Sequence, residues 1–179
     1  STPDPDRGYA LAALTGSLSF KNIKASFFKD LIKEKQDEHL FDLSYDYVGD
    51  LAETISLLWD QEKGGNMPRL SSLFENLKKA KNDELKNHII NILNISTADQ
   101  RWAFIKLFTG GLRIGVSSRL VKQALANYGN VDLEEIEKIW HGLHFPYINL
   151  FSWLENKGSK PKISIYDIFH PMMLAHPLV

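Results

Sequence analysis

The chain has 179 residues, enough for one ordinary domain with a buried core, and 44% of them are hydrophobic. It contains no run of about 18 apolar residues that would span a bilayer, and no cysteine for disulfides or thiolate metal sites. The formal net charge of −1 disfavours a protein that coats nucleic acid generally. We therefore expect a cytoplasmic protein with no membrane partner.

Apolar residues recur at helical spacing along nearly the whole chain. The helices predicted from this spacing cover residues 5–16, 25–35, 38–47, 51–59, 70–77, 85–93, 98–108, 118–128, 133–143 and 147–156. Polar residues before several of these helices predict N-terminal caps, namely Asp4, Asp50, Thr97, Ser117 and Asp132.

The apolar stripes of these helices are expected to form the core. The stripe residues include Leu14 in the first helix, Leu40, Phe41, Leu43 and Tyr47 in the third, and Leu120, Val121, Leu125 and Tyr128 in the eighth. The four tryptophans also fall in apolar stripes, and we expect them in the core: Trp59, Trp102, Trp140 and Trp153.

These patterns predict an all-α fold, a single compact multi-helix domain of about nine to ten helices with an extended C-terminal tail. We place the helical domain at residues 1–160 and a linker at residues 161–179, because Pro161, Pro171 and Pro177 interrupt the helical spacing. The end of the tail is apolar and favours a neighbouring domain. We therefore expect the chain to be a piece of a longer protein.

The charges are unevenly distributed along the chain. Residues 30–62 carry ten acidic side chains against Lys33 and Lys35, a net charge of −8, so the remainder of the chain sums to +7. This partition predicts an oriented encounter with a phosphate-bearing partner. A solvated acidic face is the alternative reading of the same pattern.

The most informative segment joins the seventh and eighth predicted helices, and its sequence is FTGGLRIGVS at residues 108–117. Its glycines let a ligand approach the main chain, and Ser117 is expected to cap the helix that follows. Exposed amides at the start of a helix favour phosphate. Five cations and no acidic residue occur nearby: Arg101, Lys106, Arg113, Arg119 and Lys122. The alternative is that the glycines only make a loose connection.

A second basic segment, SFKNIK at residues 19–24, precedes the second predicted helix. Lys21 and Lys24 are candidates for further phosphate contacts. The alternative is that they are ordinary exposed lysines. His141 and His144 lie three residues apart on one helix, but no third ligand at metal-binding spacing accompanies them, so we predict no metal site.

Three motifs in order carry a family resemblance: LSYDYVGDLAET at residues 43–54, GLRIGVS at residues 111–117 and PMMLA at residues 171–175. With the helices between them, they resemble the N-terminal DNA-binding domain of bacterial ATP-dependent DNA ligases. In that family the domain lies along the minor groove and backbone of duplex DNA on both sides of a nick. The resemblance implies the same role here, positioning nicked DNA for a catalytic core.

Carried over to this sequence, the family's loop contacts correspond to Gly110, Gly111, Arg113 and Gly115. The local argument adds Thr109, Ser117, Arg119, Lys21 and Lys24 to the candidate DNA-binding residues. No catalytic residue is expected, because the Lys-x-Asp-Gly motif that ligases adenylate is missing. The nearest run, Lys81-Asn82-Asp83-Glu84, lacks the glycine.

The resemblance further implies that ATP and Mg²⁺ act in the full-length ligase rather than in this fragment. The implied partners are nicked double-stranded DNA and the ligase's own adenylation and OB-fold domains, in a cytoplasmic, nucleoid-associated monomer. Two other function classes remain open, a helix-turn-helix regulator that reads DNA sequence and a helical scaffold that binds protein through its acidic face.

Overall fold

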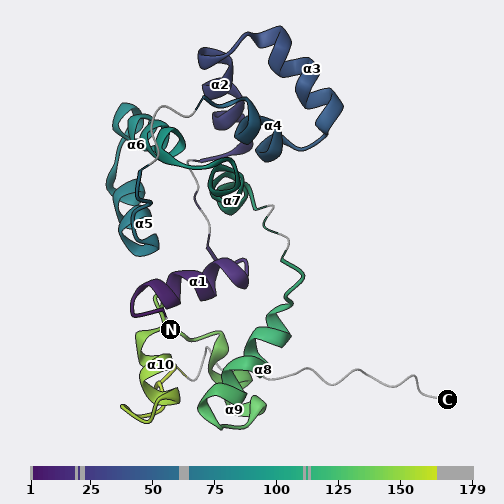
Figure 1. Cartoon of the computed structure of the whole chain (residues 1–179). Coiled ribbons are helices and arrows are strands. Elements are labelled where there is room, and N and C mark those ends of the chain that lie inside the picture. The colour runs from purple at the N-terminus through teal and green to yellow at the C-terminus, as the bar shows by residue number, and fades with distance from the viewer. Residues whose placement is uncertain are drawn as a thin grey trace, which may run out of the picture. The chain divides into compact units, whose positions relative to one another are not determined.

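The computed structural model describes residues 2–18, 20, 23–60, 65–110, 112 and 114–164, and this part of the chain is all helical (Figure 1). The helices are α1 (Asp6–Leu14), α2 (Ala25–Lys35), α3 (Glu38–Val48), α4 (Leu51–Leu58), α5 (Leu70–Lys79), α6 (Asn82–Ile95), α7 (Ala98–Thr109), α8 (Ser118–Gly129), α9 (Leu133–Trp140) and α10 (Ile148–Leu154). The all-α class is confirmed, and each predicted helix is present. None of the helices within the described ranges has the length and apolar character needed to cross a membrane.

The helices group into two compact units, which the sequence did not indicate. One unit is the continuous stretch Gly16–Ile114 and contains α2 to α7. The other combines Ser1–Thr15 with Gly115–Val179 and contains α1, α8, α9 and α10. The chain therefore passes between the units at residues 15–16 and again at residues 114–115.

The unit Gly16–Ile114 is built around α4, which contacts α2, α3 and most extensively α7. Aromatic rings fill much of its interior. The Phe108 ring lies 4.8 Å from that of Phe104 and 5.4 Å from that of Phe74. The Phe28 ring meets Phe104 edge-on at 6.4 Å. Such ring pairs contribute about 0.5–1.5 kcal/mol each beyond the burial of their area, so they fix α7 in this unit.

Arg101 on α7 is buried in this unit, with 4% of its surface exposed. Its guanidinium donates hydrogen bonds to the carbonyl oxygens of Ser56 at 2.7 Å, Ser96 at 3.1 Å and Trp59. These carbonyls lie at the ends of α4 and α6, where a helix leaves acceptors without partners. Burial lowers the pKa of Arg101, and the nearby Asp60 carboxylate partly offsets this. Arg101 thus ties two helix ends to α7.

The other unit has a core formed by α1, α8, α9 and α10. Its buried side chains are Leu11, Val121, Leu125, Ala126, Ile136, Ile139, Leu150, Phe151 and Leu154. Ile163, within the predicted linker, also packs against this core. The 160–161 boundary stays a prediction, and residues 165–179, including the PMMLA motif, lie outside the described residues.

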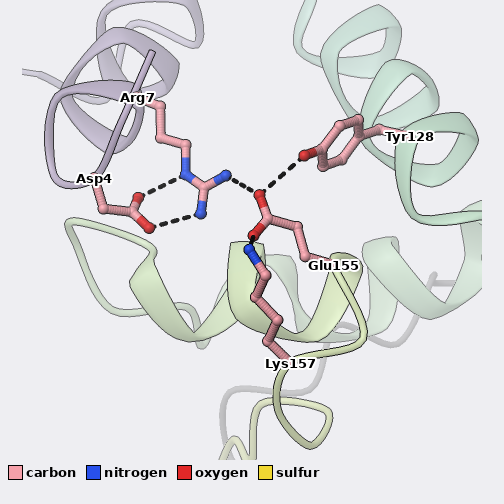
Figure 2. Close-up of polar contacts among 5 residues, drawn as sticks. All are labelled: Asp4, Arg7, Tyr128, Glu155 and Lys157. Carbon is pink, nitrogen blue, oxygen red and sulfur yellow. Dashed lines mark hydrogen bonds and ion pairs between the residues drawn. The ribbon is translucent and has the colours of Figure 1, made fainter. Parts of the chain in front are cut away.

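A polar network joins the start of α1 to the ends of α8 and α10 (Figure 2). Arg7 binds both carboxylate oxygens of Asp4 at 2.6 Å and also donates to Glu155. Glu155 accepts further hydrogen bonds from the Tyr128 hydroxyl at 2.9 Å and from Lys157 at 2.7 Å. The bond from Arg7, followed by those from Lys157 and Tyr128, lowers the pKa of Glu155 to about 2.

Two predicted caps are wrong, and three are confirmed. The side chains of Asp50, Thr97 and Ser117 accept main-chain hydrogen bonds at the starts of α4, α7 and α8. Asp4 instead binds Arg7, and α1 begins after Pro5 without a side-chain cap. Asp132 occupies the cap position of α9, but its side chain makes no cap hydrogen bond.

Part of the predicted core lies on the surface. The exposed members of the predicted stripes and tryptophans are Leu14, Leu40, Leu43, Tyr47, Trp102, Leu120 and Tyr128. In α3 only Phe41 is fully buried, because a single face of this helix packs against α2 and α4. Helical spacing identifies an apolar row, but it does not say whether a neighbouring element covers that row.

The variant Arg101→Met tests the contribution of the buried arginine to stability. Methionine keeps much of the apolar stem but leaves the carbonyls without their charged donor, so we expect the free energy of unfolding to fall by about 3–5 kcal/mol. Urea unfolding monitored by tryptophan fluorescence measures the change. The matched control is Arg119→Met at an exposed position, with a change within about 0.5 kcal/mol. A loss below about 1 kcal/mol for Arg101→Met would contradict the assigned role.

The Glu155 network predicts a specific pH dependence of stability. Because the pKa of Glu155 drops from its ordinary 4.5 to about 2 on folding, the network's contribution is fully present above pH 4.5. It is lost as the pH falls from 4.5 towards 2. We expect the stability difference between the wild type and Glu155→Gln to shrink over that interval, as measured by thermal unfolding at a series of pH values. A constant difference would show that Glu155 is not ion-paired in solution.

Candidate nucleic-acid interface

The first part of the glycine-containing segment ends α7. The Thr109 hydroxyl donates to the Ile105 carbonyl oxygen at 2.9 Å, within the last turn of the helix. Gly110 follows in the left-handed conformation, with φ of 74°, which a side chain would strain. A Cβ atom at this exposed glycine would meet nothing within 4 Å. The main chain at Gly110 is therefore open to a ligand.

The second part of the segment begins α8. Ser117 caps this helix by accepting a hydrogen bond from the Leu120 amide at 3.2 Å. The amides of Ser118 and Arg119 come before the first intrahelical bond and point out of the helix end. Residues 114–120 are all exposed, including Gly115 with φ of 68°, and the first turn has no acidic residue. This helix start has the features that favour an anion.

The predicted site residues belong to different parts of the described structure. Thr109 and Gly110 lie in the unit Gly16–Ile114, whereas Gly115, Ser117 and Arg119 lie in the other unit. Gly111 and Arg113 fall outside the described residues, so their predicted roles stay predictions.

Three of the five cations that the sequence places near this segment are engaged by other groups in the described structure. Arg101 is buried, as described above, and Lys106 forms an ion pair with Asp50 at the start of α4. Lys122 is half-buried, with its ammonium 5.5 Å from the centre of the Trp140 ring. In the described part of the chain, Arg119 is the member of this cluster that stays exposed and without an ion-pair partner.

The Lys106 ion pair shows why the sequence overestimated the number of free cations near this segment. Asp50 lies far from Lys106 in the chain, yet its carboxylate accepts hydrogen bonds from Lys106 and from the Glu53 amide. Burial by itself raises the pKa of Asp50, but these hydrogen bonds outweigh it and leave the pKa below its ordinary value. A local charge count does not detect an acidic partner supplied by another helix.

Three residues of the second predicted segment are described: Phe20, Ile23 and Lys24. The Phe20 ring is 4.8 Å from the Phe108 ring at the end of α7, and Ile23 is fully buried. Lys24 is exposed at the cap position of α2. No acidic residue occurs in the first turn of α2. Lys21 lies outside the described residues.

The end of α1, just before residues 19–24, has the same local structure as the end of α7, and the sequence analysis did not predict this likeness. Thr15 ends α1 with a hydroxyl bond to the Leu11 carbonyl oxygen at 2.9 Å, as Thr109 does at the end of α7. Gly16 follows with φ of 68° and equally open surroundings. The shared pattern Thr-Gly-x-Leu, at residues 15–18 and 109–112, was the available signal. The two copies are not part of a repeat with a fixed period.

Among the described residues, no group of three or more histidine, cysteine or acidic side chains is arranged to hold a metal ion. Lys81, in the run closest to the ligase adenylation motif, is exposed before α6, and Asp83 and Glu84 continue that helix. The run therefore forms the start of α6.

Comparison with protein families gives one finding. The model described as "DNA ligase N terminus" matches residues 10–126, well over half of the chain. The match includes both Thr-Gly segments and every helix from α2 to α7, and it ends within α8. The curated proteins contain no match to the chain.

Proposed function

The chain belongs to the DNA ligase N-terminal family, and on that basis we propose that it is the duplex-DNA-binding domain of an ATP-dependent ligase. In this role it holds nicked DNA, independently of base sequence, for a catalytic core in the full-length protein. ATP and Mg²⁺ supply the adenylation chemistry in that core, to which adenylation and OB-fold domains belong. The protein acts as a monomer in the cytoplasm, at the nucleoid.

The start of α8 is the observation that supports this role most directly. It combines outward-pointing amides, an exposed Arg119 and an absence of acidic residues that extends from residue 100 to residue 131. Amides and a guanidinium bind phosphate oxygens without reading base edges. A ligase must seal nicks in any sequence, so contacts of this kind suit its substrate.

The two Thr-Gly segments support contacts at two places on the duplex. Each one opens the main chain at a left-handed glycine and leads to a helix whose first turn lacks acidic residues. Lys24 follows the first segment, and Arg119 follows the second. In this proposal the segments bind phosphates on either side of the nick, with Arg113, Lys21, Thr109, Gly111 and Ser117 adding to the same contacts.

Binding to labelled nicked duplex, measured by fluorescence anisotropy, tests the proposal. We expect unlabelled duplexes of unrelated sequence to compete equally. If Arg113, Arg119, Lys21 and Lys24 each neutralise one phosphate, affinity falls with salt at a log-log slope of about −3 to −4. Unequal competition would support a sequence-reading regulator instead, and a lack of binding would support the protein scaffold.

Single variants locate the contacts. Arg119→Ala and Arg113→Ala are each expected to weaken binding by about 1–3 kcal/mol and to reduce the magnitude of the salt slope by about 0.9. The matched control is Lys138→Ala on α9, an exposed cation that pairs with Glu134, and its affinity should equal that of the wild type. Wild-type affinity in both arginine variants would remove the start of α8 and its preceding loop from the interface.

A second experiment concerns the chemistry. Since the chain lacks the Lys-x-Asp-Gly motif, incubation with labelled ATP and Mg²⁺ is expected to leave no adenylate on the protein. Denaturing electrophoresis followed by autoradiography detects any covalent label, and an intact ligase serves as the positive control. A labelled band would place a reactive lysine within residues 1–179 and contradict the assignment of catalysis to another domain.

A further inference from the structure

The outer face of α3 carries a row of large apolar side chains that the described structure leaves uncovered. Leu40, Leu43 and Tyr47 are 48%, 56% and 92% exposed. They are spaced i, i+3 and i+7, so they lie on one face of the helix along about 10 Å of its axis. Single exposed apolar residues are common, but an aligned row of this kind marks an interaction surface.

The packing of α3 on its own unit uses a different face. Phe41 is buried, and Tyr45 is half-buried beneath the Lys29 ammonium, 4.5 Å from the centre of its ring. These residues turn towards α2 and α4, the elements that α3 contacts. The outer row therefore does not pack against this unit, and its exposure on the surface requires another explanation.

Acidic side chains flank the row. Glu38 and Asp42 share the ammonium of Lys33, at 2.7 Å and 3.2 Å, so two carboxylates face one cation. Asp46 comes directly before Tyr47, is exposed, and has no ion-pair partner among the described residues. Elsewhere in the acidic stretch 30–62, Glu34 and Asp50 pair with Lys86 and Lys106, so the acidic charge beside the row comes from Glu38, Asp42 and Asp46. Such a face repels the phosphates of DNA and attracts a cationic partner.

We propose that the outer face of α3 docks a basic amphipathic helix of a partner protein. A helix fits because its apolar residues at i, i+3 and i+7 match the row, while lysines beside them meet the acidic flank. Tyr47 is the main contact, since a nearly fully exposed tyrosine loses the most surface on binding. This surface acts independently of the proposed DNA contacts.

The probe is a synthetic peptide of about 18 residues, five helical turns, with leucine at helical spacing and lysine elsewhere. Isothermal titration with the full chain measures its affinity. We expect binding that weakens with added salt and falls at least about tenfold in the double variant Leu43→Ser/Tyr47→Ser. Asp46→Asn should weaken it by a smaller factor, and a peptide with glutamate in place of lysine should not bind.

The controls distinguish binding at the outer face of α3 from nonspecific hydrophobic binding. Ile148→Ser removes an apolar side chain of similar exposure, 47%, from α10 in the other unit and should leave peptide affinity unchanged. Circular dichroism shows whether the double variant is folded, and its affinity for nicked duplex should equal that of the wild type. Three outcomes would each overturn the proposal. They are equal binding of the lysine and glutamate peptides, an equal loss of peptide affinity in Ile148→Ser, and sedimentation that shows a dimer of the chain formed through Tyr47.

Discussion

The buried guanidinium of Arg101 is the interaction on which the unit Gly16–Ile114 depends most. It satisfies main-chain carbonyls at the ends of α4 and α6 from a position on α7. Leaving a buried charge and its partners unsatisfied is among the more damaging changes a core can undergo. The same helix, α7, ends at Thr109 with Gly110 as its left-handed cap, so the helix that Arg101 anchors also carries the open main chain of the candidate interface.

The proposed phosphate binding belongs to a chain with almost no net charge. Most of the local cations that the sequence offered are used internally: one is buried, one pairs with a carboxylate and one lies over an indole ring. What remains for a ligand is a small set of exposed cations beside helix starts. Contacts by amides need no net charge, since the partial charges at a helix start are already oriented.

Sequence periodicity predicted every helix, because each combines an apolar stripe with a recognisable start or stop. The caps of Asp50, Thr97 and Ser117 were predictable for the same reason, since a cap is a local interaction. Burial was harder to predict, because exposure of Tyr47 or Trp102 depends on whether another helix lies over it. The roles of the cations and the two-unit division depend on residues far apart in the chain, whereas each Thr-Gly turn is local and carries the shared pattern Thr-Gly-x-Leu. For the candidate site, the sequence indicated the two segments, but it did not show which of the neighbouring cations are free to bind a ligand.

The unit that contains α1 is discontinuous in the sequence, and this imposes an order on folding during synthesis. Gly16–Ile114 is a single stretch, so it can fold once it has left the ribosome, whereas the unit containing α1 needs α10 as well. At about 5–20 residues per second, translation from residue 114 to residue 154 takes roughly 2–8 s. During that interval the apolar residues of α1, including Leu11, lack the core that later covers them. Within the nascent chain, the apolar residues of α1 are thus buried only after α8, α9 and α10 have been made.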